Sequence, residues 1–317
     1  MEETLAYYRT ILPRLEAPFE IRHDDTQGKH IVAIKDIPCG TSILEESPLV
    51  CWPSRLAWAE LEVCGHCLRK PPKRPKHRVC DNCCVESFCH RTCVSAIHDS
   101  CLCSVLKALR SHSFYDMDGA TDEENPCFTL ETLARIVAHI TVRLVATAEK
   151  LQVTLEQAAP TVMAPWERLM TVPDEAEFAL NIPLAEVFTV LREIMAPSVT
   201  QTLGEEFAKE LLSDAFLRGL LGRVVVNAQS CTNGAAVYVI QSNFNHSCSP
   251  NCQVDFEETS DIAVKTCKDV KIGEELTISY IPDGLKYVER KSRLETSHLF
   301  TCSCELCEME KKTMMTV

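Results

Sequence analysis

The residues with the clearest chemistry are cysteines that fall in closely spaced pairs. The chain of 317 residues contains 19 cysteines and 10 histidines. A Cys-x2-Cys pair points two thiolates at one ion, and thiolates combined with imidazoles form the ligand sets of structural zinc. Four pairs of candidate ligands lie within residues 64–103: two are Cys-x2-Cys, one is Cys-x3-Cys and one is His-x2-Cys. They supply eight candidate ligands: Cys64, Cys67, Cys80, Cys83, Cys89, Cys93, His98 and Cys101. The segment therefore predicts two zinc ions, whose binding would supply most of its folding energy.

Two of these ligand positions have close neighbours that could replace them. Cys84 could take the place of Cys83, and Cys103 could take the place of Cys101. We favour Cys101, because a spacing of i, i+3 keeps it on the same helical face as His98, whereas i+5 does not.

Three further stretches combine polar, aromatic and thiol side chains. They are SNFNHSCSPN at 242–251, GEELTISY at 273–280 and FTCSCELC at 300–307. A capped turn would explain the Ser, Pro and Asn residues of the first stretch. A capped turn would not explain why a tyrosine and a second cysteine cluster follow this stretch. The three stretches together therefore indicate a functional site.

The elements that must position these residues are of two kinds. Short apolar runs between turn residues predict strands at 19–21, 30–34, 42–44, 224–226, 237–240, 262–264 and 276–278. Apolar residues at helical spacing predict helices in 130–151, 184–195 and 205–221. We expect the prolines at 160, 165, 173 and 183 to separate the helices of this middle part.

The composition restricts the class of protein. Hydrophobic residues make up 46% and charged residues 24%, which excludes a disordered or collagen-like chain. No apolar run approaches the roughly 18 residues of a membrane helix, and the acidic start lacks the features of a secretory signal. The net charge of −13 argues against nucleic-acid binding and favours a basic partner. We interpret the basic loop 69–78 as solvated, and we expect reduced thiols in the cytoplasm or nucleus.

The motifs resemble two known modules. The first cluster resembles a MYND zinc finger, in which two Cys-x2-Cys pairs precede an aromatic-Cys-x3-Cys pair and a final His-x3-Cys; here the last pair is His-x2-Cys. The remaining motifs resemble the SET domain of protein lysine methyltransferases. They are NHSCxPN, GEELxxxY and FxCxCxxC, together with the opening segment 28–46. A MYND finger inserted in a SET domain is the plan of the SET-and-MYND methyltransferases. The resemblance covers 20–103 and 220–308 and is closest to their short branch, without the C-terminal helical domain.

The resemblance implies three zinc sites. By analogy with MYND fingers the pairs interleave, so that one zinc is held by Cys64, Cys67, Cys89 and Cys93. The second is then held by Cys80, Cys83, His98 and Cys101. The tail motif supplies only three thiolates, so a fourth ligand must come from elsewhere. The implied third site is Cys248, Cys302, Cys304 and Cys307.

The resemblance also implies a site for S-adenosylmethionine. Asn245 and His246 would hold it, with Ser242 and Asn227 nearby. Phe300 would stack on the adenine, and Tyr280 would direct its hydroxyl at the point of methyl transfer. The Gly-x-Gly motif of the family is Gly28-Lys29-His30 here. Lys29 could contact the cofactor carboxylate, whereas the side chain of His30 could crowd the pocket or point outward.

The expected fold is α+β: a β-rich SET fold with a pseudoknot, an inserted MYND finger, a helical insert and a zinc-binding post-SET tail. Residues 1–63 and 223–283 would form the SET domain, the second part carrying the catalytic core. Residues 64–103 would form the finger, 104–222 the helical insert and 284–317 the post-SET segment.

The resemblance implies an S-adenosylmethionine-dependent protein-lysine N-methyltransferase that acts on the ε-amine of a lysine in a basic protein, histone or other. The alternative is a SET scaffold with weak or no activity that serves as an adaptor through its finger, and it is motivated by His30. A proline-rich peptide is an implied partner of the finger. We expect a monomer without membrane contact or direct nucleic-acid binding.

Overall fold

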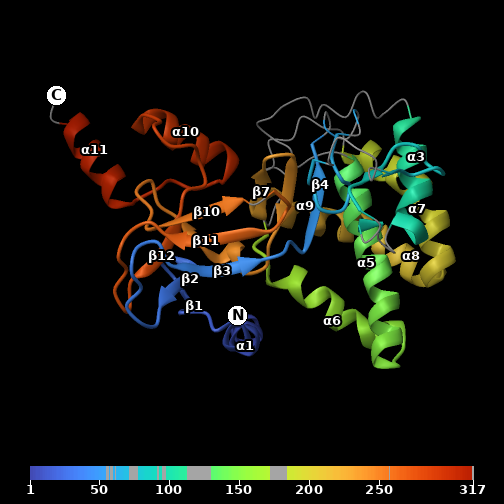
Figure 1. Ribbon diagram of the computed structural model, residues 1–317, viewed down its shortest axis with the longest axis horizontal. Helices are drawn as coiled ribbons and strands as arrows, with labels where there is room; N and C mark the ends of the chain where they lie inside the picture. Colours follow the sequence, from blue (N-terminus) through green and yellow to red (C-terminus); the bar gives the residue numbers. More distant parts are fainter. Residues whose placement is uncertain are drawn as a thin grey trace. The chain divides into compact units, whose positions relative to one another are not determined.

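The computed structural model describes residues 1–54, 57, 60, 62–70, 78–90, 93–94, 98–112, 130–171, 184–256 and 258–315 (Figure 1). The chain divides into two compact units. The first comprises Met1–Ser47, Val239–Glu257 and Asp261–Val317, and the second comprises Pro48–Tyr238 and Glu258–Ser260. Among the described helices, none is both long and apolar enough for a membrane span.

The first unit is built on a four-stranded sheet with the order β1-β2-β12-β9. Its strands are β1 (Phe19–Asp24), β2 (Gly28–Ala33), β12 (Glu275–Ile278) and β9 (Asn245–His246). Alternate side chains of these strands point to one face and are buried there with residues of the N-terminal helix, because side chains in a strand alternate between faces. This core includes Tyr8, Leu12, Phe19, Ile21, Ile31, Ala33, Leu276 and Ile278.

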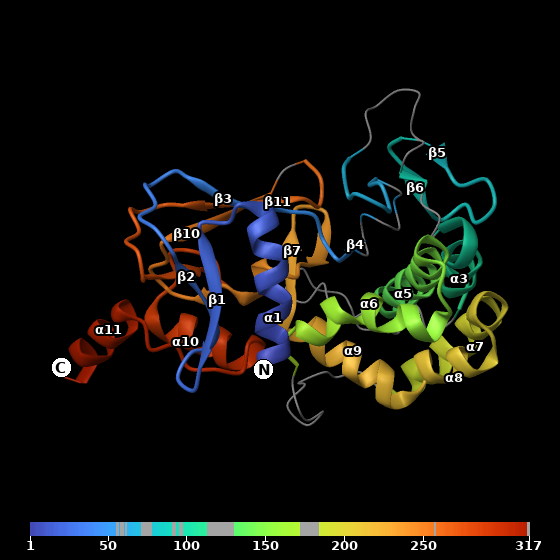
Figure 2. The ribbon, with the colours of Figure 1, turned by 90° about the horizontal axis from the view of Figure 1, so that it is seen from below.

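A second sheet and several helices complete this unit. The sheet has the order β10-β11-β3, with β10 (Cys252–Phe256), β11 (Ile262–Thr266) and β3 (Ser42–Glu46). The helical elements are α1 (Glu2–Ile11), η1 (Leu12–Leu15), η5 (Gln241–Asn243), α10 (Tyr287–Ser297) and α11 (Glu305–Met315). Helix α1 lies alongside β1 (Figure 2).

The strands β9 and β12 are the feature that matters most for the site. They pair in parallel, with Thr277 opposite Asn245 and Ile278 opposite His246. The side chain of Asn251 fixes this pairing from the side, since its Nδ2 donates to the Glu275 carbonyl at 2.8 Å and its Oδ1 accepts the Thr277 N–H at 2.9 Å. Two motifs distant in the sequence thereby lie side by side.

The second unit combines a small sheet with a helical core. The sheet is β4-β8-β7, formed by β4 (Val50–Pro53), β8 (Gly234–Val237) and β7 (Ala228–Cys231). A Cβ atom at Gly234 would lie 2.0 Å from the Trp52 carbonyl, so only glycine fits there. The other elements are β5 (Arg78–Val79), β6 (Ser87–Phe88), η3 (His98–Leu102), α3 (Cys103–Arg110), α5 (Leu130–Leu151), α6 (Leu155–Arg168), α7 (Leu184–Leu203), α8 (Glu205–Leu211) and α9 (Asp214–Asn227).

Most predicted elements are confirmed, and three predictions are wrong. Of the strand expected at 237–240, only Val237 lies in a strand, where it ends β8, and residues 239–240 form a turn before η5. The strands at 19–21, 30–34 and 42–44 and the helix over 130–151 appear as β1, β2, β3 and α5. Residues 224–226 were expected as a strand but belong to α9, because Val224 continues the helical spacing of buried Leu217, Leu220 and Leu221. The apolar face therefore overrides the β preference of three valines.

The prolines at 160 and 165 lie inside α6 rather than between helices. Each proline removes a backbone N–H, which weakens a helix. Here a capping box at Thr154 satisfies the first turn, and the buried side chains of Ala158, Val162 and Trp166 hold the helix on the core. The prolines at 173 and 183 lie outside the described residues.

Candidate active site and metal centres

His246 and Tyr280 are joined by a hydrogen bond and by ring contact. The backbone N–H of Tyr280 donates to His246 Nδ1 at 3.0 Å, and the two ring centroids lie 5.4 Å apart. The parallel pairing of β9 with β12 positions both residues, since each follows or belongs to a paired strand. The sequence motifs around them therefore meet in space, as the predicted site requires.

The hydrogen bonds of His246 fix its tautomer. Nδ1 accepts from a backbone N–H, so the proton of the neutral ring is on Nε2, which lies 3.2 Å from Cys248 Sγ. Burial, with a smaller contribution from the nearby His298 and Arg290, lowers the pKa of His246 to about 4. The ring is therefore neutral at pH 7 and donates its N–H to the sulfur.

The phenol of Tyr280 is held in place and stays neutral. Its hydroxyl donates to the Phe244 carbonyl at 2.6 Å. Burial raises the pKa of Tyr280 above its ordinary value, and the negative charge of Glu275 acts in the same direction. Tyr280 therefore offers a fixed, uncharged hydroxyl that can accept or share a hydrogen bond but does not act as a base at neutral pH.

Three other aromatic rings lie near the ring of Tyr280. The ring of Phe300 lies 6.0 Å from that of His246 and 6.3 Å from that of Tyr280, and the ring of His298 lies 5.0 Å from that of Tyr280. The four residues are only half-buried. Their remaining exposed faces suit a flat heterocycle, which stacks on aromatic rings, and a cation, which is attracted by the ring quadrupole.

The turn between β1 and β2 is tied to the same site. The side chain of Asn245 donates to the Gln27 carbonyl at 3.1 Å and to Glu275 Oε1 at 3.0 Å. Gly28 adopts φ +65°, a conformation that favours glycine, and leads directly into β2. The Gly28 turn, Asn245, His246, Tyr280 and Phe300 thus belong to one unit.

His30 stands where the family motif has its second glycine, and it is buried. Only 5% of the residue is exposed, and its Nδ1 lies 3.0 Å from the Gly28 carbonyl. Its ring therefore does not point outward into solvent. It lies on the face of β2 opposite Ile31 and Ala33, which fill the core.

Two predicted cofactor residues use their side chains locally. The hydroxyl of Ser242 donates to the Val239 carbonyl at 3.2 Å. Asn227 ends α9 in the second unit, where its Nδ2 donates to the carbonyls of Met170 and Arg223 at 2.8 and 2.6 Å. A role for these two residues toward a cofactor stays a prediction.

The third cysteine cluster has the geometry of a metal site. The Sγ atoms of Cys248, Cys302, Cys304 and Cys307 all lie within 4.8 Å of one another. Cys248 Sγ is 3.5 Å from Cys307 Sγ and 4.0 Å from Cys302 Sγ. Four thiolates around a tetrahedral zinc, with Zn–S bonds of ~2.3 Å, lie about 3.8 Å apart. The residues therefore fit zinc, and Cys248 joins the tail to the segment that carries Asn245 and His246.

A buried arginine lies beside this cluster. Arg290 of α10 is 7% exposed, and its Nη2 lies 3.9 Å from Cys307 Sγ and 2.5 Å from Glu310 Oε2. Four thiolates and one zinc ion carry a net charge of −2, so a cation at this place offsets the excess. Sequence inspection does not single out this residue, because other basic residues lie close to it: Lys286 just before the helix, and Lys291 and Arg293 within it.

The first cluster matches the interleaved arrangement. Cys64, Cys67, Cys89 and Cys93 converge, with Sγ–Sγ distances of 3.6 Å for Cys67 and Cys89 and 3.5 Å for Cys89 and Cys93. These distances also suit a tetrahedral zinc with four thiolate ligands.

The second cluster corrects one predicted ligand. It comprises Cys80, Cys83, His98 and Cys103, not Cys101. Cys80 Sγ and Cys103 Sγ are 3.7 Å apart, and Cys83 Sγ is 3.8 Å from His98 Nε2. Cys101 is 2% exposed and belongs to the apolar core, where burial raises the pKa of its thiol to about 11.

The local helix geometry explains the correction. Residues His98–Leu102 form a π-helix, in which the hydrogen bonds join residues i and i+5. The wider turn brings Cys103 onto the face of His98 and rotates Cys101 away from it. The same structure places Cys83 in the cluster and leaves Cys84 exposed with φ +58°, in agreement with the preference for Cys83.

Comparisons with known proteins define the class. The family model of the SET domain matches residues 28–281, so the chain belongs to the SET domain family. This match and the sheets of the first unit confirm the predicted α+β SET fold, and the three clusters are compatible with zinc.

The relatives support the SET-and-MYND type. The histone-lysine N-methyltransferase ASHR2 of Arabidopsis thaliana is 26% identical over 298 residues, which are 90% of this chain and 70% of that protein. A SET and MYND domain-containing protein of Dictyostelium discoideum is 25% identical over 92% of this chain and 60% of its own length. The human histone-lysine N-methyltransferase SMYD3 is 31% identical over 102 residues, 32% of this chain and 24% of that protein. The chain thus spans 60–70% of the first two relatives.

Proposed function

We propose that the chain is an S-adenosylmethionine-dependent protein-lysine N-methyltransferase that acts on a lysine of a basic protein. The observation that carries this proposal is the parallel pairing of β9 with β12, which joins Asn245 and His246 to the fixed phenol of Tyr280. The relatives named as histone-lysine N-methyltransferases support the reaction class.

The half-buried aromatic cluster fits the cofactor. Phe300 offers a ring face for the adenine, and the rings of Tyr280 and His246 offer a π environment for a sulfonium. When bound, S-adenosylmethionine supplies a methyl group on this positively charged sulfur. Asn245, the Gly28 turn and His246 would hold it, and Lys29 would approach its carboxylate.

The residues of this chain contribute mainly orientation and exclusion of water. A free lysine amine has a pKa of about 10.4, so it is protonated at neutral pH and cannot attack a methyl group. Removal of water by the aromatic rings lowers that pKa and favours the neutral amine. The hydroxyl of Tyr280, held by the Phe244 carbonyl, orients the amine, and alignment of the reacting atoms accounts for much of the rate.

Three zinc ions would bind, one at each of the three cysteine clusters. The third one would hold the tail that carries Phe300, through Cys302, Cys304 and Cys307, against the segment that carries Cys248. The net charge of −13 favours a Lys-rich substrate, histone or other, and disfavours nucleic acid. We place the monomeric protein in the cytoplasm or nucleus and assign a proline-rich peptide to the finger.

The test is methyl transfer from radiolabelled S-adenosylmethionine to fractionated cell extract. We expect labelled basic proteins with the wild type and a loss of about 100-fold or more with Tyr280→Phe, which removes only the hydroxyl. Isothermal titration with zinc-loaded protein should show cofactor binding for both. Equal labelling by the two proteins would refute the assigned role of Tyr280.

His30 favours one alternative, a SET scaffold that acts as an adaptor through its finger. Its buried imidazole occupies the position of the second motif glycine. His30→Gly distinguishes the two functions: if the imidazole blocks the pocket, the variant should gain cofactor binding that the wild type lacks. If the wild type binds the cofactor, and His30→Gly binds it equally or more weakly, the imidazole does not block the pocket. His30 would then give no support to the adaptor function.

A further inference from the structure

Three consecutive backbone N–H groups converge on one carboxylate in the first unit. Glu46 ends β3, and its Oε1 accepts from the N–H groups of Val239 and Ile240 at 2.8 and 2.9 Å. Its Oε2 accepts from the N–H of Gln241 at 2.9 Å. Hydrogen bonds to an ionised acceptor are stronger than those between neutral groups. Glu46 therefore anchors the chain where it enters η5, the single turn that precedes β9.

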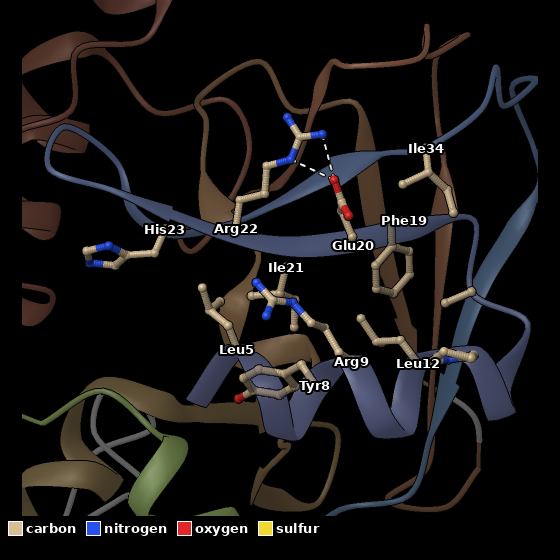
Figure 3. A pocket seen from close by; sticks show the side chains of 12 residues that line it. Leu5, Tyr8, Arg9, Leu12, Phe19, Glu20, Ile21, Arg22, His23 and Ile34 are labelled. Atoms are coloured by element: carbon tan, nitrogen blue, oxygen red, sulfur yellow. Dashed lines mark hydrogen bonds and ion pairs between the residues drawn. The ribbon is translucent and has the colours of Figure 1, made fainter. Parts of the chain in front are cut away.

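The carbonyls of the same peptide groups are held from the opposite edge. The Val239 carbonyl accepts from the Tyr8 hydroxyl at 3.2 Å and from Asn243 Nδ2 at 2.8 Å. The Ile240 carbonyl accepts from the Asn243 N–H at 3.0 Å. Tyr8 of α1 is 1% exposed and lies at the groove between this helix and β1 (Figure 3). An acceptor at the N–H and a donor at the carbonyl polarise a peptide group in the same direction, so the two sets of hydrogen bonds strengthen each other.

Hydrogen bonds continue from this anchor to the phenol of the proposed site. The Phe244 N–H donates to the Gln241 carbonyl at 3.0 Å, and the Phe244 carbonyl accepts from the Tyr280 hydroxyl at 2.6 Å. Gln241 is also the residue whose N–H donates to Glu46 Oε2. Glu46, Gln241, Phe244 and Tyr280 thus form one connected path within the first unit.

Phe244 lies just outside the strand pairing that fixes the rest of the site. Strand β9 begins at Asn245, and its register with β12 holds Asn245 and His246 independently of η5. The ring of Phe244 is fully buried, whereas the direction of its carbonyl is set by the turn that leads into it. A shift of η5 should therefore displace the acceptor of the Tyr280 hydroxyl before it affects Asn245 or His246.

We propose that Glu46 is a positioning residue for methyl transfer, which acts through η5 and the Phe244 carbonyl to aim the Tyr280 hydroxyl at the substrate amine. This inference rests on the proposed methyltransferase function. A displacement of about 1 Å in a reacting geometry can lower a rate about 100-fold, so a small shift of this acceptor is enough to matter.

Glu46→Gln makes the smallest change that disturbs the anchor. In either orientation of the new amide, its nitrogen is a donor and opposes at least one of the three N–H groups. Glu45→Gln is the matched control, because it makes the same chemical change at the exposed neighbouring residue of β3. Both changes are tested alone and in combination with Tyr280→Phe.

The assay is radiolabelled methyl transfer to the basic-protein fraction of a cell extract, with S-adenosylmethionine as the varied substrate. Burial raises the pKa of Glu46 to about 7, and the three N–H groups act in the opposite direction. The assay is therefore run at about pH 9, where a carboxyl with this pKa is ionised.

We expect Glu46→Gln to lower kcat about 10–100-fold, and to change the KM and the calorimetric Kd of the cofactor by less than about twofold. Glu45→Gln should match the wild type. In the Tyr280→Phe background, Glu46→Gln should have no further effect on kcat, because no hydroxyl remains to be aimed.

A role of Glu46 in stability alone predicts a different pattern. The kcat would then fall by the same factor with and without the Tyr280 hydroxyl, and this result would overturn the proposal. A wild-type kcat for Glu46→Gln would overturn it too, while the proposed function would stand. If the wild type itself transfers no methyl group, the proposed function fails and this inference fails with it.

Tyr8→Phe is a second arm that does not depend on the folding of Glu46→Gln. It removes one neutral hydrogen bond from the same turn, on the side of α1, and should lower kcat about 3–10-fold. This effect should also vanish in the Tyr280→Phe background. An unchanged kcat for Tyr8→Phe, or a decrease that is the same without the Tyr280 hydroxyl, would contradict the positioning of the phenol through η5.

Discussion

Replacement of Arg290 by methionine tests whether a buried cation stabilises the third cysteine cluster. Arg290 Nη2 lies 3.9 Å from Cys307 Sγ, and the residue is 7% exposed, so solvent screens this interaction little. A hydrogen bond to a charged group is worth roughly 1.5–3 kcal/mol, and the loss of a partner of a metal ligand weakens metal binding by about 10–100-fold. The variant also leaves Glu310 without its cation, which adds to the loss.

The assay is competition between the protein and a chromophoric zinc chelator. We expect Arg290→Met to release its most weakly bound zinc ion at a free chelator concentration about 10–100-fold lower than the wild type requires. Arg293→Met is the matched control, because it makes the same chemical change at an exposed position of the same helix. If both variants retain zinc equally, the reasoning that assigns Arg290 to charge compensation is refuted.

Three other predictions follow from the clusters and from the half-buried His139. Cys103→Ser should remove one zinc per chain in elemental analysis, whereas Cys101→Ser should keep all of them; the reverse result would restore the i, i+3 assignment. Strong chelation should unfold residues 64–103 before the rest, because zinc supplies their folding energy, and hydrogen exchange would detect a different order. Burial lowers the pKa of His139 to about 4 from an unfolded value of 6.5, so the unfolded state takes up its proton first as pH falls. Stability should therefore decrease from pH 6.5 toward pH 4, and His139→Asn should reduce this decrease in urea titrations of the zinc-loaded protein; an identical pH dependence would contradict the argument.

Motif spacing predicted much of the site. The thiols of Cys248 and the tail meet as expected, because a set of three thiolates requires a fourth from elsewhere. The proximity of His246 to Tyr280 depends on a strand pairing that no local pattern reveals. It was available only through the resemblance of two separate motifs to one family.

The charged residues inside the structure could not be predicted. Arg135 of α5 is 4% exposed and donates to Glu131 at 2.5 Å and to Glu86 at 2.9 Å, which ties the helix to the first cysteine-rich segment. In the sequence Glu131 and Arg135 show only the i, i+4 spacing of an ordinary surface pair. The pair is buried because Arg135 also contacts Glu86, which is far away in the sequence. Helical periodicity gives no information about such long-range partners.

The π-helical turn at His98–Leu102 shows how a metal site tolerates a change of chain length. One residue added to an α-helix normally rotates everything that follows it by about 100°, which would carry a ligand off its ion. Here the spacing from His98 to Cys103 is one residue longer than His-x3-Cys. A single turn of the helix is wider than an α-helical turn and accommodates the extra residue. Insertions at such places can therefore persist during evolution, provided that the backbone, and not the ligand, takes up the additional length.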